Sequence, residues 1–143
     1  MNLLVDGMIR APLSDFAIIS IYSLPNELLF TPQNLDKIKK LGCSDVLSLL
    51  FWDIDPLTEK VGDAPIFTET HAQEVRNYLD KINCFPNDVV LLVHCDAGIS
   101  RSGAVATFAS NYFNIDFQDE YIKPNPYVLR ILNNLIWNEK YQG

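Results

Sequence analysis

The sequence of 143 residues is poor in cysteine and histidine, and it contains no long uninterrupted apolar run. Its three cysteines, Cys43, Cys84 and Cys95, are too few and too irregularly spaced for a disulfide framework or a zinc knuckle. We expect free thiols, with Cys43 and Cys84 as small buried hydrophobes. No apolar run approaches the roughly 18 residues that a membrane span needs, because Asp6 and Arg10 interrupt the N-terminal one. These absences predict a soluble, cytoplasmic protein without a signal peptide.

Basic residues are also scarce, since 11 of them face 18 acidic residues and give a formal net charge of -7. A protein that binds nucleic acid through its backbone needs a concentrated basic face. Here the basic residues gather only at Lys37, Lys39 and Lys40, where they compensate the dipole at the end of an expected helix. The charge balance therefore disfavours nucleic acid as a partner.

The length and the 48% of hydrophobic residues fit one domain, residues 1–143, with a sizeable core. Short β-branched and apolar runs alternate with segments of helical periodicity. Strands are expected at residues 16–22, 45–52 and 88–93, and helices at residues 32–41, 68–85, 100–113 and from 126 onward. Such alternation predicts an α/β fold with a central, mostly parallel sheet flanked by helices.

In parallel sheets of this kind, ligands bind outside the carboxyl ends of the strands. That rule selects two segments of the sequence. The first is a long loop at residues 53–67, which is rich in acids and carries two prolines. The second is the segment at residues 94–103, named here the Cys95 loop, which connects an expected strand to an expected helix. Long loops in compact domains, such as the one expected at residues 53–67, often carry function.

The Cys95 loop has the chemistry of an anion-binding site. A loop that enters a helix directs several backbone N–H groups to one point, and the helix dipole adds positive charge. A thiol such as Cys95 should there have a pKa below its usual value of about 8.5. Gly98 allows tight curvature, and the planar guanidinium of Arg101 can bind two phosphate oxygens. The hydroxyl of Ser102 can reach back to the sulfur.

With His94 before the cysteine, the segment reads His-Cys-x-x-Gly-x-x-Arg-Ser. This pattern resembles the signature of the cysteine-based protein tyrosine phosphatases, and its Gly-Ile-Ser-Arg-Ser-Gly part is most similar to the compact dual-specificity members. The resemblance implies the phosphatase fold, catalytic roles for Cys95, Arg101 and Ser102, and a supporting role for His94. It also implies phosphate binding by Asp96, Ala97, Gly98, Ile99, Ser100 and Arg101.

By the same resemblance, the Cys95 thiolate attacks phosphorus and forms a cysteinyl-phosphate, which water then hydrolyses. Arg101 and the loop N–H groups stabilise the charge on the equatorial oxygens. The resemblance implies no metal and no cofactor, because the loop itself supplies the positive field.

The leaving group needs a proton, and related enzymes supply it from an aspartate on a separate loop. Asp53, Asp55 and Asp63 are the candidates in the loop at residues 53–67. We favour Asp53, because it directly follows the strand expected at residues 45–52 and should project from the sheet edge toward Cys95. His71, in the first turn of the next helix, is expected to be structural.

The expected activity is that of a protein phosphatase acting on phosphotyrosine, with phosphoserine and phosphothreonine as further substrates, so the expected partner is a phosphorylated protein. Lipid-phosphate members of the superfamily tend to carry lysine within the loop, whereas this loop has Asp96 and no lysine. The alternatives are a phosphatase of an inositide or of an RNA 5'-phosphate, and an inactive module that binds phosphate. The sequence does not predict an oligomeric state.

Overall fold

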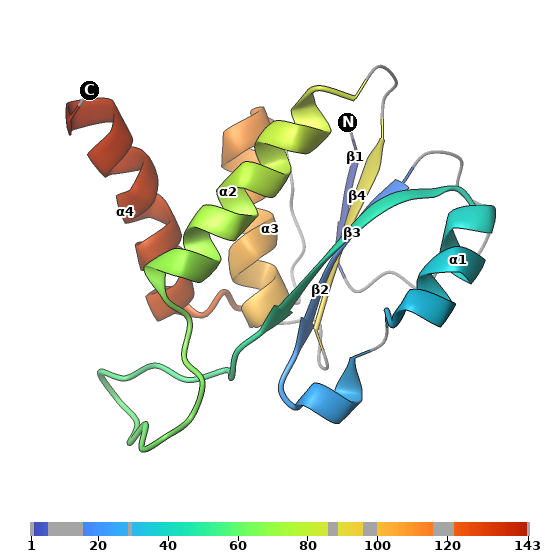
Figure 1. The fold of residues 1–143 in the computed structure, drawn as a ribbon. Helices are drawn as coiled ribbons and strands as arrows, with labels where there is room; N and C mark the ends of the chain where they lie inside the picture. Colours follow the sequence, from blue (N-terminus) through green and yellow to red (C-terminus); the bar gives the residue numbers. More distant parts are fainter. Residues whose placement is uncertain are drawn as a thin grey trace.

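Four parallel strands form the centre of the structure, a computed structural model that describes residues 2–5, 16–28, 30–85, 89–95, 100–115 and 122–142 (Figure 1). The strands are β1 (Asn2–Val5), β2 (Phe16–Tyr22), β3 (Cys43–Leu50) and β4 (Val90–His94). The helices are α1 (Pro32–Lys40), α2 (Glu69–Asn83), α3 (Arg101–Phe113) and α4 (Pro126–Gln142), with a short 3₁₀ helix η1 (Pro25–Glu27). The α/β class expected from the sequence is confirmed.

The strand order is β1-β4-β2-β3, and every pairing is parallel. β4 therefore lies inside the sheet, and its neighbour β2 is inside it as well. The register between these two strands places Ser20 opposite His94. This pairing brings the residues that follow β2 and β4 to the same edge of the sheet, where the Cys95 loop begins.

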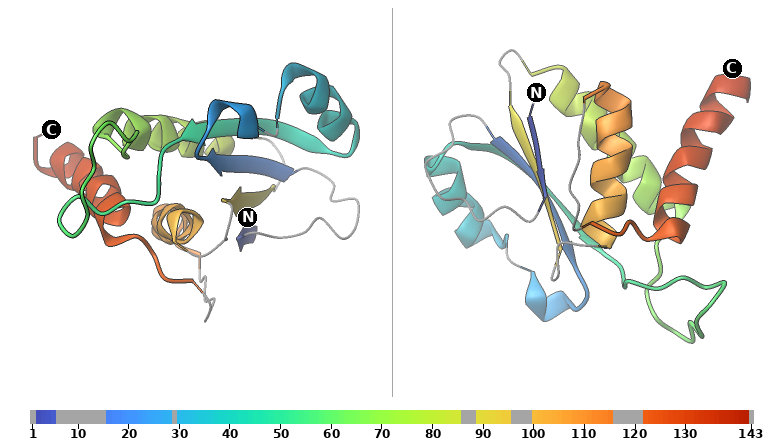
Figure 2. Two further views of the ribbon diagram at one scale, coloured as in Figure 1. Left: turned by 90° about the horizontal axis from the view of Figure 1, so that it is seen from below. Right: turned by 180° about the vertical axis from the view of Figure 1, so that it is seen from behind.

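Helices cover both faces of the sheet, α1 on one side and α2, α3 and α4 on the other (Figures 1 and 2). Side chains of a strand alternate between its faces. Ile18 of β2 accordingly packs in a small cluster beneath α1, whereas Ala17, Ile19 and Ile21 belong to the larger core beneath the other three helices. Apolar residues on both faces explain why the strands read as continuous hydrophobic runs.

The helix ends follow the expected local chemistry. Thr31 Oγ1 accepts a hydrogen bond from the Asn34 N–H at 3.4 Å, with Pro32 at the first helical position of α1. Gly42 ends that segment at φ +106°, a conformation that suits glycine. The apolar stripe expected on α2 is buried and consists of Ala72, Val75, Leu79 and Ile82.

Several expectations differ from the structure, among them the start of β3 at Cys43 rather than at residue 45 and the span of β4, expected at residues 88–93. The sequence did not predict β1, a run of only four residues whose pairing with β4 is long-range. β3 ends at Leu50 rather than at residue 52, because the Trp52 N–H turns to the Pro65 carbonyl at 2.8 Å and leaves the sheet. Cys84 is exposed rather than buried, since it is the C-cap of α2.

No helix in the described part of the chain combines the length and the apolarity that a membrane span requires.

Candidate active site

Cys95 lies one residue beyond β4, at the carboxyl edge of the sheet. The side chain is only 3% exposed, and its Sγ is 3.2 Å from Ser102 Oγ. Ser102 is fully buried in the first turn of α3. Its hydroxyl can therefore donate a hydrogen bond to a Cys95 thiolate, as expected from the sequence.

Four residues expected to bind phosphate, Asp96, Ala97, Gly98 and Ile99, lie outside the described residues, so their role stays a prediction. The chain is described again from Ser100, which precedes the first residue of α3, Arg101. The two described ends of the Cys95 loop thus lie at the end of an interior strand and at the start of a buried helix.

The Arg101 side chain is 6% exposed and is held by groups that follow two different strands. Its Nη1 donates hydrogen bonds of 2.8 Å to Ser23 Oγ, just beyond β2, and of 2.8 Å to the Phe51 carbonyl, just beyond β3. Ser23 is itself fixed, because its N–H donates to Glu27 Oε2 at 3.3 Å and its carbonyl accepts from Trp52 Nε1 at 2.8 Å. These contacts orient the guanidinium before any anion arrives.

Asp53 reaches the start of α3 from the loop that follows β3. Its Oδ1 accepts hydrogen bonds from Ser100 Oγ at 2.7 Å and from Asn125 Nδ2 at 2.9 Å. The loop and the start of α3 meet at the lower end of the sheet in Figure 1. Asp53 thus contacts the described end of the Cys95 loop, although the sheet does not hold it there as expected, and its role as the general acid stays a prediction. β3 ends three residues before Asp53, so the sheet does not hold this residue. The hydrogen bonds of its side chain to Ser100 and Asn125 hold it instead.

The other two candidate acids do not make such contacts. Asp55 Oδ1 accepts from the Leu57 N–H at 3.0 Å, and the Asp55 carbonyl accepts from the N–H groups of Thr58 and Glu59. Asp55 therefore stabilises a turn within its own loop. Asp63 is exposed in the same loop. Of the three aspartates, only Asp53 bonds to a described residue of the Cys95 loop.

Both histidines have structural contacts. His94 Nε2 is 2.8 Å from Ser20 Oγ on the neighbouring strand, and this contact fixes the ring beside Cys95. The His71 Nδ1 accepts from the Thr68 N–H at 3.0 Å, and its Nε2 donates to the Leu50 carbonyl at 3.0 Å. His71 thus has the structural contacts expected for it, and the supporting role of His94 stays a prediction.

The sequence analysis missed Ser23 and Asn125. Asn125 stands before a proline and an apolar-periodic segment, which is a sequence signal for a helix N-cap. That signal gives no indication of the contact with Asp53, which joins residues 72 positions apart. Ser23 carries no signal of its own, because only the fold brings it to Arg101.

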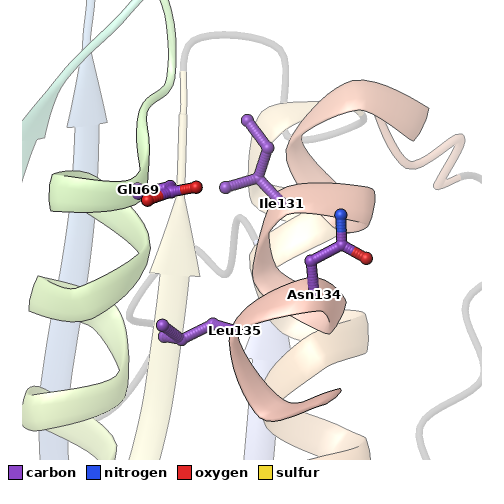
Figure 3. A pocket seen from close by; sticks show the side chains of 4 residues that line it. All are labelled: Glu69, Ile131, Asn134 and Leu135. Atoms are coloured by element: carbon purple, nitrogen blue, oxygen red, sulfur yellow. The ribbon is translucent and has the colours of Figure 1, made fainter. Parts of the chain in front are cut away.

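A small hollow of about 70 Å³ lies between α2 and α4, and neither Cys95, Arg101 nor Asp53 lines it (Figure 3). Glu69 lines it from α2, and Ile131, Asn134 and Leu135 line it from α4. Sites for small molecules usually have volumes of about 300–1,000 Å³. We assign no ligand to this hollow.

All four strands are parallel in the order β1-β4-β2-β3, Cys95 follows the interior strand β4, and Arg101 begins α3. Among solved structures, the crystal structure of human tyrosine phosphatase-like serine/threonine/tyrosine-interacting protein has this fold, with a TM-score of 0.52. The two sequences are 18% identical over 91% of this chain and 80% of that one. No protein-family model and no curated protein matches the sequence. The structural likeness establishes the fold.

Proposed function

We propose that this protein is a cysteine-dependent phosphatase, similar to the compact dual-specificity enzymes, that hydrolyses phosphotyrosine in proteins. One observation carries the proposal: Asp53 Oδ1 accepts a hydrogen bond of 2.7 Å from Ser100 Oγ. That bond brings a carboxyl group to the loop that holds a cysteine and a prepositioned arginine. A module that only binds phosphate needs the arginine and the loop, but it has no use for a proton donor.

The first step transfers the phosphoryl group to the enzyme. The Cys95 thiolate attacks phosphorus, a P–S bond forms, and the P–O bond to the leaving group breaks. Asp53 gives its proton to the departing oxygen, which leaves as a neutral phenol or alcohol. Arg101 binds two of the equatorial oxygens, whose charge it stabilises together with the N–H groups of the Cys95 loop.

The second step restores the enzyme. Water attacks phosphorus, its proton passes to the Asp53 carboxylate, and the P–S bond breaks. The Cys95 sulfur leaves as a thiolate, which the Ser102 hydroxyl at 3.2 Å can stabilise by donating a hydrogen bond. Inorganic phosphate is the product, and Asp53 is protonated for the next cycle. Phosphocysteine is thus the intermediate of the reaction.

Charge favours a protein substrate over a polyanion. The net charge is -7, and the carboxylate of Glu27 accepts a hydrogen bond from the backbone of Ser23, the residue that orients Arg101. Asp96 adds a further acid within the Cys95 loop. An inositide polyphosphate or an RNA 5'-phosphate would be repelled by this arrangement. A phosphotyrosine residue carries its phosphate on an otherwise neutral side chain.

The test compares the wild type with Cys95→Ser on p-nitrophenyl phosphate and on paired phosphotyrosine and phosphoserine peptides. We expect turnover by the wild type, faster on phosphotyrosine, and a phosphocysteine that rapid denaturation traps. Cys95→Ser should lose turnover and still bind tungstate, because Arg101 and the backbone hold the anion. Tungstate binding by a wild type without turnover would indicate the phosphate-binding module instead. Cys95→Ser activity within tenfold of the wild type would overturn the assignment of the nucleophile.

A further inference from the structure

We propose that Asn125 is a positioning residue for the general acid, and that it fixes which oxygen of Asp53 carries the catalytic proton. The inference rests on the proposed function and adds a residue from α4 to its machinery. Asn125 lies immediately before α4, far in sequence from Asp53 and from the Cys95 loop. Its side chain is nevertheless only 5% exposed, because it lies at the junction of three segments.

The amide nitrogen of Asn125 faces the acid. Nδ2 donates to Asp53 Oδ1 at 2.9 Å and to the Ile54 carbonyl at 3.2 Å. A primary amide has two N–H groups, and both are used here. The Asn125 amide nitrogen therefore holds both the carboxylate of Asp53 and the backbone of the next residue, Ile54. The position of Asp53 is fixed through both groups.

The amide oxygen faces the helix. Asn125 Oδ1 accepts from the Tyr127 N–H at 2.9 Å and from the Val128 N–H at 3.1 Å, so it caps the first turn of α4. These two donors require oxygen on that side and nitrogen on the side of Asp53. The backbone N–H of Asn125 also donates to the Ser100 carbonyl at 3.0 Å. Asn125 is therefore held by both α4 and the start of α3.

Two donors meet at one oxygen of the acid. Ser100 Oγ and Asn125 Nδ2 both donate to Asp53 Oδ1. No described residue forms a hydrogen bond with Oδ2. An oxygen that already accepts two hydrogen bonds is the poorer place for a proton. Oδ1 is thus the anchor, and Oδ2 carries the proton that the leaving group receives.

A helix cap alone would also explain a buried asparagine, so the test must separate the two roles. Asn125→Ser keeps a cap acceptor, because serine is a preferred N-cap residue, but its hydroxyl is too short to replace Nδ2 at Asp53. Asn125→Asp also keeps the cap and exchanges the donor for an acceptor that repels Asp53. Tyr127→Phe is the matched control: it removes the bond from Tyr127 Oη to the Phe67 carbonyl in the same helical turn and leaves Asp53 untouched.

The experiment measures kcat/KM for each full-length variant on aryl phosphates whose leaving phenols range from acidic to weakly acidic. For Asn125→Ser we expect a loss of about 10-fold or more on phenyl phosphate and a much smaller loss on an acidic leaving group, the pattern of a weakened general acid. Asn125→Asp should show the same pattern more strongly. Tyr127→Phe should not change the leaving-group dependence. In an Asp53→Asn background, Asn125→Ser should have little further effect, because the two residues act as a unit.

The outcomes separate this inference from the function on which it rests. Wild-type turnover with a leaving-group effect for Asp53→Asn, but none for Asn125→Ser, would overturn the positioning role and leave the phosphatase assignment intact. Equal losses on all leaving groups would reduce Asn125 to a helix cap and would equally overturn the inference. A wild type without turnover would overturn both. Thermal unfolding of each variant shows whether it folds. If either Asn125→Ser or Asn125→Asp fails to fold, the other variant provides the test.

Discussion

Arg101 Nη1 donates a hydrogen bond of 2.8 Å to Ser23 Oγ, although the two residues are 78 positions apart in the chain. The same nitrogen also donates to the Phe51 carbonyl. The guanidinium is therefore oriented by the segments that follow β2 and β3, while Arg101 itself belongs to α3. Three elements must fold together before this side chain has its final direction.

Arg101→Lys should be severely impaired although the positive charge is kept. An ammonium group cannot bond to Ser23 and the Phe51 carbonyl and still present a planar fork to phosphate. We expect kcat to fall by about 10²–10³, the cost of losing a prepositioned donor to the transition state. Steady-state hydrolysis and inhibition by vanadate measure the effect. Ser23→Ala serves as the graded control and should lose less, because the Phe51 contact remains. A lysine variant with near-normal rates would contradict the proposed binding of two phosphate oxygens by Arg101.

Asp53→Asn should lower the rate on phenyl phosphate by about 10²–10⁴ and flatten the alkaline limb of the pH–rate profile. The loss should be much smaller for a leaving phenol that needs no proton. Asp55→Asn and Asp63→Asn are the matched controls, since Asp55 stabilises a turn and, among the described residues, only Asp53 of the three bonds to Ser100 and Asn125. Kinetics on the same series of aryl phosphates test all three. The assignment fails if Asp55→Asn has this signature and Asp53→Asn lacks it.

The three cysteines should differ in their response to iodoacetamide. Burial raises the pKa of the Cys43 thiol, so its labelling should be slow and should not respond to phosphate. Cys84 is exposed, and its labelling should not respond to phosphate. Labelling of Cys95 should slow when phosphate occupies the loop. Peptide mapping of timed reactions at pH 7, with and without phosphate, provides the test. Protection of Cys84, or none for Cys95, would place the anion site elsewhere.

Stability should fall as the pH rises from about 10 to about 12, in part through Tyr112. Burial and a hydrogen bond to Asp80 raise the pKa of Tyr112 from 10.0 to about 12. As the pH rises, the unfolded chain therefore loses the Tyr112 proton first. The stability that this raised pKa contributes is fully present below pH 10 and is lost as the pH rises through the pKa of Tyr112 in the folded protein. Denaturant unfolding at several pH values measures the slope. Tyr112→Phe should reduce that slope, and an unchanged slope would contradict the raised pKa.

Much of the fold could be predicted because its elements carry local signals. β2 spans residues 16–22 as expected, since apolar and β-branched residues fill both of its faces. Thr31, Pro32 and Gly42 set the limits of α1 through capping and backbone conformation alone. β1 escaped prediction because four residues become a strand only through pairing with β4. The end of β3 was misjudged because Phe51 and Trp52 continue the apolar run after the chain has left the sheet.

In the candidate site too, residues with a local sequence signal could be predicted, whereas long-range contacts could not. Cys95, Arg101 and Ser102 could be proposed as site residues because their spacing is local and chemically specific. Asp53 was favoured over Asp55 on the argument that the strand held it, whereas Ser100 and Asn125 hold it in the structure. Such partners cannot be read from the sequence, since their contacts span 47 and 72 positions.

The hydrogen bond from the Trp52 N–H to the Pro65 carbonyl closes the acid-bearing loop at its base. Asp53 stands beside this closure and has its own anchors, so its position does not depend on the tip of the loop. Within the same loop, Gly62 has φ +54° and open space where a side chain would begin. Once a flexible loop is closed, each doubling of its length costs only about 0.6 kcal/mol. Residues in this part of the loop can therefore be inserted or exchanged at a small cost in free energy while Asp53 stays where it is.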